Sequence, residues 1–309
     1  MSDAAIQALI RAALREDVGR GDVTSRSVIP AMRRSQARVI AKAPGVVAGA
    51  AVAARVFQVV DRAIACRIQR RDGQAVRRGQ TILRVSGPAR SILTAERTAL
   101  NLLGHLSGVA SLTAQFVRRV RPYPVKILDT RKTLPNLRAL QKQAVRAGGG
   151  HNHRMGLDDA VLIKTNHLIV LRAATSDKRQ VTSEELISTA VSRARRARPR
   201  AWIEIEVRNV SELKAALRAR PDAILLDNWR VGRLRTAVAL RNSSPVTRSR
   251  RPRSPYAAHR TPLLEVSGGV TLENVRRIAA AGVDRISIGR LTHSAPALDV
   301  SLRMIRHQG

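Results

Sequence analysis

From Pro124 onward the sequence alternates short apolar segments with amphipathic ones, and this alternation constrains the fold more than any other feature. The apolar segments have the length of strands, and the segments between them carry apolar residues at three- and four-residue intervals, the spacing of one helix face. Strands that alternate with helices form parallel sheets with right-handed crossovers. The predicted strands are 125–128, 160–163, 202–207, 223–226, 263–266 and 285–288, and the predicted helices are 137–147, 184–198, 210–218, 231–241 and 272–281.

Nearly every predicted strand ends in a charged, hydroxyl or glycine residue. An active site assembled from the carboxyl ends of many strands is typical of a β/α barrel, whereas an open sheet concentrates its ligand at one switch point. The pattern therefore favours a barrel. The residues at these strand ends are Asp129-Thr130-Arg131-Lys132, Lys164-Thr165-Asn166-His167, Glu206, Asp227-Asn228, Ser267-Gly268-Gly269 and Gly289.

The first third of the chain follows another pattern. Residues 4–15 carry apolar side chains at helical spacing, which predicts an amphipathic helix. Residues 35–85 consist of short β-branched runs interrupted by glycines, which predicts a small unit rich in strands. Helical spacing returns between 91 and 120, with Gly104 and Gly108 inside. This segment predicts two helices, or one kinked helix, crossing between two domains with a boundary near Gly108.

The net charge of the chain is +34, from 56 Lys and Arg residues against 22 Asp and Glu residues. The basic residues lie along the whole length, so we interpret most of this charge as a solvated surface that attracts anionic substrates. Association with nucleic acid is an alternative. Aromatic residues make up only 2% of the chain, which argues against the base-stacking platforms of single-strand binders.

The sequence contains a single cysteine, Cys66, so it excludes a disulfide framework and any metal site built on cysteines. It has no apolar run of about 18 residues, the length needed to span a membrane. The first residues lack a basic segment followed by an apolar run. Together these features predict a cytoplasmic protein.

The stretch 129–167 concentrates positive charge. Arg131, Lys132, His153, Arg154 and Lys164 fall within it, around a turn formed by Gly148-Gly149-Gly150. Arginine has a planar guanidinium group that matches a carboxylate or a phosphate with two parallel hydrogen bonds. We therefore predict a pocket for a small anion that carries more than one negative charge.

Glycine-containing segments follow the last two predicted strands. Ser267-Gly268-Gly269 precedes a helix expected from Thr271, and Ser287-Ile288-Gly289 precedes a short helical stretch. Glycine lets backbone N–H groups approach a phosphate, and the positive end of a helix favours its charge. Because the loops after the last two strands are the usual phosphate site of β/α barrels, we predict a phosphate site here.

Glu204 and Glu206 alternate within one predicted strand, so both face the same side of the sheet. Two acids facing a barrel interior need cations nearby, and Arg or Lys partners are one explanation for Glu204. Glu206 lies nearer the carboxyl end, where it and Asp227 could face hydroxyl groups or a magnesium ion bound to a diphosphate. His151 and His153 lack further ligands at zinc spacing, so we predict no zinc site.

Seven short sequences, in order along nearly the whole chain, resemble the quinolinate phosphoribosyltransferase family, also called nicotinate-nucleotide pyrophosphorylase (carboxylating). The resemblance implies a type II phosphoribosyltransferase-like α/β fold: an N-terminal α/β sandwich domain (1–108), an incomplete β/α barrel with the catalytic site (109–290), and a C-terminal helical segment (291–309) that packs back on the N-terminal domain. It also implies a homodimer with shared active sites. The matching sequences are EDVGRGDVT (16–24), ERTALN (96–101), DTRKT (129–133), GGGHNHR (148–154), LLDN (225–228), EVSGG (265–269) and LTHS (291–294).

The resemblance implies an enzyme of NAD biosynthesis. It would transfer phosphoribosyl from phosphoribosyl pyrophosphate (PRPP) to quinolinate with loss of carbon dioxide, using Mg²⁺ and no organic cofactor. Carried over by position, Arg131, His153, Arg154 and Lys164 would hold the two carboxylates of quinolinate, helped by Thr130 and by Arg97 of the neighbouring subunit. The ribose and magnesium diphosphate of PRPP would face Lys132, Glu206 and Asp227, which with Lys164 are the expected catalytic residues, and its 5′-phosphate would lie against Ser267, Gly268, Gly269 and Gly289.

Two features depart from the family pattern. Thr165 stands where the family usually has an acid after the catalytic lysine, and the Arg-, Ser- and Pro-rich segment 243–260 is longer than expected and predicts a solvated loop. One alternative function is that of a same-fold paralogue, of the molybdenum-transport-associated type, acting on another anionic acceptor. A second is that of a basic nucleic-acid-associated protein, which would bind DNA with a steep salt dependence. Arg131 and Arg154 favour a dicarboxylate, and hence quinolinate.

Overall fold

The structure is a computed structural model that describes residues 2–174, 182–244 and 261–305. It consists of two compact units, each formed by separate stretches of the chain. Unit 1 comprises Met1–Gln115, Lys132–Asn152 and Gly289–Gly309, and unit 2 comprises Phe116–Arg131 and His153–Ile288. Of the predicted Arg-rich loop, residues 245–260 lie outside the described residues. No helix in the described ranges has both the length and the apolar character needed to span a membrane.

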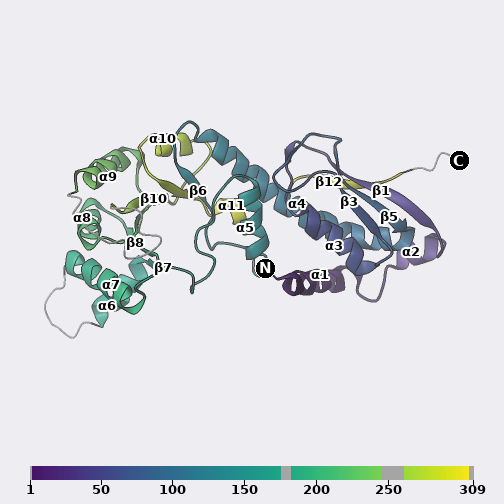
Figure 1. Ribbon diagram of the computed structural model, residues 1–309, viewed down its shortest axis with the longest axis horizontal. Coiled ribbons are helices and arrows are strands. Elements are labelled where there is room, and N and C mark those ends of the chain that lie inside the picture. Colours follow the sequence, from purple (N-terminus) through teal and green to yellow (C-terminus); the bar gives the residue numbers. More distant parts are fainter. Residues whose placement is uncertain (1, 175–181, 245–260, 306–309) are drawn as a thin grey trace. The chain divides into compact units, whose positions relative to one another are not determined.

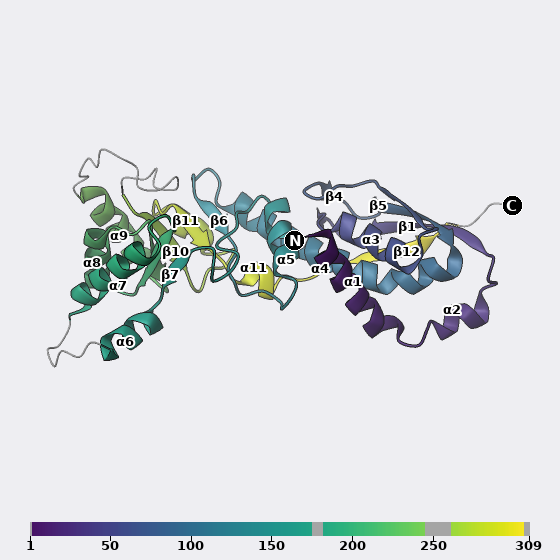
Figure 2. The ribbon, with the colours of Figure 1, turned by 60° about the horizontal axis from the view of Figure 1, so that its bottom comes forward.

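Unit 1 combines helices with a four-stranded antiparallel sheet in the order β12-β1-β5-β3 (Figures 1 and 2). A two-stranded ribbon, β2-β4, adds to it. The strands are β1 (Arg34–Ala41), β2 (Gly45–Val46), β3 (Ala65–Ile68), β4 (Ala75–Val76), β5 (Thr81–Pro88) and β12 (Val300–Met304); the helices are α1 (Asp3–Val18), α2 (Val23–Val28), α3 (Ala50–Val60), α4 (Ala89–Arg119), α5 (Arg138–Ala147) and α11 (Arg290–His293).

Helix α3 lies within the stretch 35–85, which the sequence predicts to be a small unit rich in strands. The strands around the helix are confirmed, but a helix over 50–60 was not predicted. Alanine, the strongest helix former, occurs four times in α3. Its first turn is also capped from outside the segment, because the carboxylate of Asp72 accepts hydrogen bonds from the N–H groups of Gly49 and Ala50 at 2.9 and 3.0 Å. That cap depends on the tertiary fold and leaves no trace in the local pattern.

Helix α4 is one continuous helix of 31 residues rather than two. The helix continues through residue 108 without a break. The domain boundary predicted near Gly108 stays a prediction. Its glycines have a packing role, because residues 296–298 lie against the helix. A Cβ on Gly108 would lie 2.1 Å from the carbonyl oxygen of Pro296, and the N–H of Leu298 donates to the carbonyl of Gly104 at 2.9 Å. Only glycine permits so close a backbone approach.

The chain ends as a strand in the sheet of unit 1. The prediction of a helical segment over 291–309 is wrong for Val300–Met304, which form β12 and pair with β1 in antiparallel register from Ala37↔Met304 to Ala41↔Val300. Apolar and polar residues alternate through Val300-Ser301-Leu302-Arg303-Met304, which is the strand period. Only α11 is helical in the described part of this segment.

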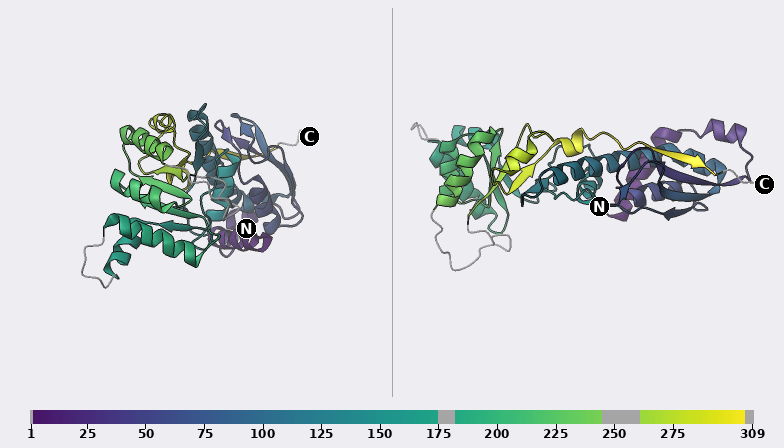
Figure 3. Two further views of the ribbon diagram at one scale, coloured as in Figure 1. Left: turned by 60° about the vertical axis from the view of Figure 1, so that its left-hand side comes forward. Right: turned by 90° about the horizontal axis from the view of Figure 1, so that it is seen from above.

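Unit 2 contains a six-stranded sheet in the order β6-β11-β10-β9-β8-β7, and every neighbouring pair is parallel. Strands β6 and β7 are its two edges, so the barrel is incomplete, as predicted. Helices α7, α8 and α9 lie side by side along it (Figure 3). The strands are β6 (Lys126–Leu128), β7 (Val161–Ile163), β8 (Ile203–Val207), β9 (Ala223–Asp227), β10 (Leu263–Ser267) and β11 (Arg285–Ser287), and the helices are α6 (Thr165–Ala173), α7 (Ser183–Ala197), α8 (Val210–Ala219), α9 (Val231–Ser243) and α10 (Val275–Ala279).

The alternation of strands and helices predicted after Pro124 is confirmed, with element ends displaced by a few residues. Local capping explains where two of these helices begin. Thr182 and Glu185 form a reciprocal capping box at α7, and the side chain of Asn209 accepts the N–H of Glu212 at α8. Helix α6 is missing from the prediction, because residues 165–173 bury no side chain and therefore lack a core-facing stripe.

Candidate active site

The carboxyl ends of the strands in unit 2 carry the predicted polar residues. The parallel register places Ser267 opposite both Asp227 and Ser287, and Glu206 opposite Leu225. Because carboxyl ends of parallel strands share one edge of a sheet, these groups lie on the same rim. Thr130 and Arg131 follow β6 and are half-buried, while Lys164 follows β7 and is exposed.

Asp129 and the pair His153-Arg154 are linked by hydrogen bonds within unit 2. Asp129 is fully buried, and its Oδ1 accepts the backbone N–H of His153 at 2.9 Å. The backbone N–H of Arg154 donates to Nδ1 of His153 at 2.8 Å, and Nη1 of Arg154 donates to the carbonyl of Ala160 at 2.8 Å. Arg154 is therefore held on both its backbone and its side chain.

Arg131 lies close enough to Arg154 for its positive charge to act on the guanidinium group of Arg154. The pKa of Arg154 is lowered, first by burial and then by the positive charge of Arg131. Like charges brought together in a partly buried site are unfavourable unless an anion lies beside them. Each guanidinium can form two parallel hydrogen bonds with a carboxylate. This pair can therefore bind a small dianion.

Behind these arginines lies a buried network of two acids, one histidine and one arginine, which we call the His153 network: His153, Glu204, Glu265 and Arg285. Nε2 of His153 lies 3.0 Å from Oε2 of Glu204 and 3.5 Å from Oε1 of Glu265. Nε of Arg285 lies 3.3 Å from Oε2 of Glu265. Glu204 and Glu265 are 1% and 0% exposed, so both depend on these partners for compensation of their charge.

Burial and neighbouring charges shift the titration of this network. Burial and the charge of Glu204 raise the pKa of Glu265 to about 7, against the opposing effects of His153 and Arg285. Burial acts to lower the pKa of His153, but the hydrogen bond with Glu204 and the charges of both acids outweigh it, so this pKa is raised. The N–H that Arg154 donates to Nδ1 opposes protonation of that nitrogen. When the ring is neutral, its one proton therefore lies on Nε2, where it faces Glu204.

The His153 network differs from the sequence-based interpretation of its members. The partner of Glu204 is His153, not an arginine or lysine. Glu265 and Arg285 were not predicted as site residues, and only the alternating inward positions of β10 and β11 could have indicated them. The ligand atoms of His153, Glu204 and Glu265 lie within 4.8 Å of one another, close enough to hold a metal ion. Arg285 also supplies positive charge to Glu265.

Glu206 and Asp227 offer carboxylate oxygens at the ends of β8 and β9. Both are half-buried. Oε1 of Glu206 accepts the hydroxyl of Thr165 at 2.7 Å and its backbone N–H at 3.3 Å, and Oδ2 of Asp227 accepts Nδ2 of Asn228 at 3.0 Å. Thr165 thus orients Glu206 with a neutral hydroxyl. Half-buried carboxylates are ligands that fit Mg²⁺.

The glycine turn after β10 has the backbone freedom that phosphate binding needs. Gly268 and Gly269 are exposed and have φ of +87° and +59°. A Cβ on Gly268 would lie 2.0 Å from Oδ1 of Asn228, so the turn packs directly against the end of β9. The predicted helix start at Thr271 is wrong: α10 begins at Val275, and Asn274 closes the turn by accepting the N–H of Thr271. The backbone of the turn, rather than a helix end, is what a phosphate would meet.

Three further predicted residues belong to unit 1. Lys132 is exposed and lies against Gly289, where an added Cβ would be 3.0 Å from Cδ of the lysine. The hydroxyl of Thr292 donates to the carbonyl of Lys132 at 2.7 Å. Arg97 is exposed on α4. Unit 1 therefore brings Lys132 and Gly289 together.

The glycine turn 148–150, around which the basic residues of the anion pocket were predicted to lie, packs against α4. A Cβ on Gly148 would lie 2.3 Å from the carbonyl oxygen of Ala110, and one on Gly150 would lie 2.7 Å from Cγ2 of Thr113. The glycines thus allow the end of α5 to approach α4.

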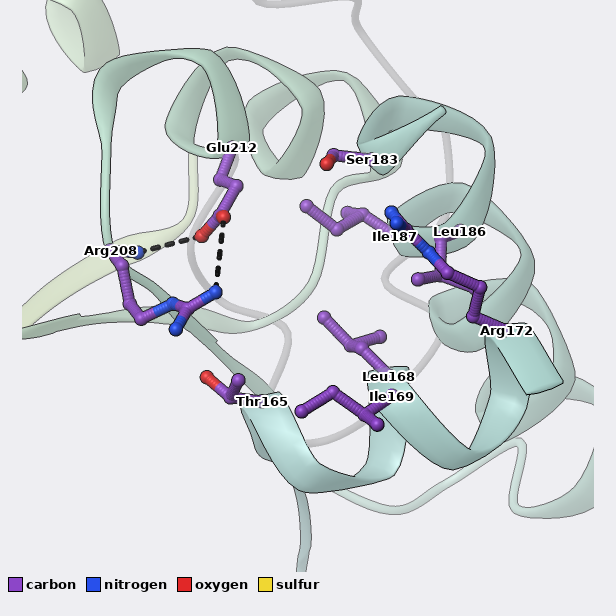
Figure 4. A pocket seen from close by; sticks show the side chains of 9 residues that line it. All are labelled: Thr165, Leu168, Ile169, Arg172, Ser183, Leu186, Ile187, Arg208 and Glu212. Atoms are coloured by element: carbon purple, nitrogen blue, oxygen red, sulfur yellow. Dashed lines mark hydrogen bonds and ion pairs between the residues drawn. The ribbon is translucent and has the colours of Figure 1, made fainter. Parts of the chain in front are cut away.

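A cavity of about 340 Å³ is lined in part by Thr165, the first residue of α6 (Figure 4). Its walls come from α6, α7 and the start of α8. Apolar side chains form one part, and Arg208 and Glu212 form another through their ion pair. The lining residues are Thr165, Leu168, Ile169, Arg172, Ser183, Leu186, Ile187, Arg208 and Glu212.

The sheet of unit 2 and the groups on its rim define an α/β enzyme of the phosphoribosyltransferase class. The chain belongs to the quinolinate phosphoribosyl transferase family, because the model of the family's N-terminal domain matches residues 22–107 and that of its C-terminal domain matches residues 109–303. This confirms the resemblance and the predicted fold class.

Relatives that carry an enzyme name match this chain over nearly its whole length. The carboxylating nicotinate-nucleotide pyrophosphorylase of Mycobacterium leprae is 42% identical over 296 residues, which cover 95% of each chain. The probable enzyme of that name from Synechocystis is 39% identical and covers 95% of this chain and 90% of its own. The structure of the nicotinate-nucleotide pyrophosphorylase from Francisella tularensis superimposes with a TM-score of 0.84 at 34% identity, covering 99% of this chain and 98% of that one.

Proposed function

We propose that the chain transfers the phosphoribosyl group of PRPP to quinolinate with decarboxylation, giving nicotinate mononucleotide, diphosphate and carbon dioxide. The observation that carries this proposal is the placement of two arginines next to strands of the parallel sheet. Arg131 follows β6 and is half-buried, and the side chain of Arg154 is held by the carbonyl of Ala160, directly before β7. Such a pair favours a ligand with two negative charges over one with a single charge. The names of the relatives and the family domains support the same reaction.

Each predicted residue has a role in this mechanism. Arg131, Arg154 and Lys164 hold the carboxylates of quinolinate, with Thr130 beside them, and His153 supports Arg154. The pyridine nitrogen attacks the anomeric carbon as the bond to diphosphate breaks, and Glu206 and Asp227 stabilise the positive charge that develops on the sugar. The adduct then loses its 2-carboxylate as carbon dioxide. The electron pair of the broken bond stays on ring carbon 2, where the adjacent positive ring nitrogen stabilises it, and a proton then takes it up.

The phosphates of PRPP need positive charge and backbone donors. We assign the 5′-phosphate to Ser267, Gly268, Gly269 and Gly289, and the diphosphate to Lys132. Glu206 and Asp227 would hold Mg²⁺, which when bound neutralises charge on the departing diphosphate. No organic cofactor is needed, because the substrates themselves supply the leaving group and the electron sink.

A steady-state assay with three acceptor conditions tests the substrate assignment. Purified protein with PRPP and magnesium should form a mononucleotide with quinolinate, and none with nicotinate or without acceptor. Nicotinate carries one carboxylate, so it leaves part of the guanidinium pair unpaired. Turnover with nicotinate and not with quinolinate would overturn the assignment, and binding of DNA without any turnover would favour the nucleic-acid alternative.

We further propose a cytoplasmic homodimer in which Arg97 completes the site of the partner subunit. Arg97 is exposed on α4. If the sites are shared, mixing inactive Arg97→Ala and Arg154→Ala proteins should restore about a quarter of the wild-type activity per site, because random exchange of subunits rebuilds one intact site in each mixed dimer. No recovery in mixed dimers confirmed by mass spectrometry would show that Arg97 acts within its own subunit or not at all.

A further inference from the structure

Gln141 of α5 is fully buried and uses its whole side-chain amide in hydrogen bonds. Its Oε1 accepts the backbone N–H of Leu134 at 3.0 Å. Its Nε2 donates to the backbone carbonyl of Thr292 at 2.7 Å and lies 2.9 Å from Nε2 of His105. These partners come from three separate parts of unit 1: the segment after Lys132, helix α11 and helix α4.

The chemistry of these partners fixes the orientation of the amide. A backbone N–H can only donate and a backbone carbonyl can only accept, so Oε1 and Nε2 cannot exchange places. His105 must therefore accept at Nε2 and carry its proton on Nδ1. Burial lowers the pKa of His105, which keeps the ring neutral and able to accept.

A second hydrogen bond joins the same two segments. The hydroxyl of Thr292, which is 1% exposed, donates to the carbonyl of Lys132 at 2.7 Å and lies 3.1 Å from the carbonyl of Gly289. Lys132 in turn lies against Gly289. Thr292 thus holds the backbone at the carbonyl of Lys132, and Gln141 holds it two residues later at Leu134. Both residues tie this backbone to the segment that begins at Gly289.

We infer that Gln141 and Thr292 are positioning residues for the PRPP subsite. They hold Lys132 beside Gly289, so that the diphosphate of PRPP meets Lys132 while its 5′-phosphate meets Gly289. This inference rests on the proposed function for the identity of the ligand. Neither side chain contacts substrate, since both are buried. Their effect should reach PRPP through Lys132 and leave quinolinate, which we assign to Arg131 and Arg154, unaffected.

The test compares two disruptive variants with two matched controls. Thr292→Val removes the hydroxyl and keeps the backbone carbonyl, whereas Thr292→Ser keeps both. Gln141→Leu removes all three hydrogen bonds of the side-chain amide. Gln143→Leu makes the same change two residues along α5, where the side chain is exposed. Kinetic constants are measured for each substrate, and PRPP binding with magnesium is also measured by titration calorimetry, which does not depend on turnover. Melting temperatures report any loss of stability.

We expect Thr292→Val and Gln141→Leu to raise the KM and the dissociation constant for PRPP by about tenfold. The KM for quinolinate should change less than about twofold, and both controls should match the wild type. A wild type that binds PRPP but gives no product with quinolinate would refute the proposed function and leave the calorimetric comparison to decide this inference. The inference that Gln141 and Thr292 position Lys132 would be overturned if Thr292→Val bound PRPP as tightly as the wild type. It would also be overturned if the variants bound PRPP and quinolinate more weakly by the same factor.

Discussion

Replacing Arg154 by alanine should lower kcat/KM for quinolinate by about 10² to 10³ fold, the largest effect that we expect of any single substitution. Charge-assisted hydrogen bonds to a carboxylate contribute about 1.5 to 3 kcal/mol each, and a bidentate pair is stronger than a single bond. The side chain of Arg154 donates to the carbonyl of Ala160, and its backbone N–H donates to Nδ1 of His153. The wild-type site therefore does not have to order this side chain when the substrate binds. Steady-state kinetics with quinolinate varied at saturating PRPP measures the change.

Two control variants separate geometry from charge. Arg154→Lys keeps the positive charge and loses the planar fork, so it should recover only part of the activity. Arg196→Ala makes the same change in net charge at an exposed position of α7, and its kinetics should match those of the wild type. If Arg196→Ala were as damaging as Arg154→Ala, the overall charge of +34 would be attracting the substrate, and the guanidinium pair would not be the binding site.

Replacing Glu265 by glutamine should remove a pH dependence of stability that the wild type shows near neutral pH. The pKa of Glu265 is raised from 4.5 to about 7 in the folded chain, so between these values the native state binds more protons than the unfolded state. Stability therefore falls as pH rises through this window, being fully present below the unfolded pKa and lost above the folded one. The raised pKa of His153 acts in the same direction.

The expected size follows from the shift. One pKa unit corresponds to about 1.4 kcal/mol, so the free energy of unfolding of the wild type should fall by on the order of 2 to 3 kcal/mol relative to Glu265→Gln between about pH 5 and pH 8. Urea unfolding at several pH values measures this difference. Glu184→Gln, at a side chain 56% exposed, is the control and should run parallel to the wild type. A constant difference between wild type and Glu265→Gln across this range would show that Glu265 does not titrate there.

Much of unit 2 could be predicted from the sequence because its signals are local. Each strand is a short apolar run, each helix has a core-facing stripe, and the polar residue that follows a strand marks the rim of the sheet. The same logic placed Glu204 and Glu206 on one face of β8. Helix α6 escaped prediction because it buries no side chain and has no stripe to detect.

The errors in unit 1 have tertiary causes. Helix α3 is capped by Asp72 from a distant turn, and β12 is a strand because β1 offers it an edge with which to pair. The glycines of α4 and of the turn 148–150 are explained by neighbours that are distant in sequence. None of these partners can be identified from residue spacing alone.

The candidate site likewise contains residues that the sequence could indicate and residues that only the tertiary structure brings together. Arg131, Arg154, Glu206 and Asp227 could be proposed because they stand at strand ends and match the family. The connection from His153 to Glu204, Glu265 and Arg285 joins residues of β8, β10 and β11 that lie far apart in the sequence. Likewise, the bonds of Gln141 link residues 105, 134 and 292, which no local pattern relates.

The central claim is that this chain couples phosphoribosyl transfer to decarboxylation of a pyridine dicarboxylate. The most direct test measures carbon dioxide and diphosphate together in one reaction of purified protein with PRPP, magnesium, and quinolinate labelled in its 2-carboxylate. We predict one labelled carbon dioxide for each diphosphate, and neither when PRPP is omitted. Diphosphate released without carbon dioxide, or carbon dioxide released without PRPP, would contradict the account.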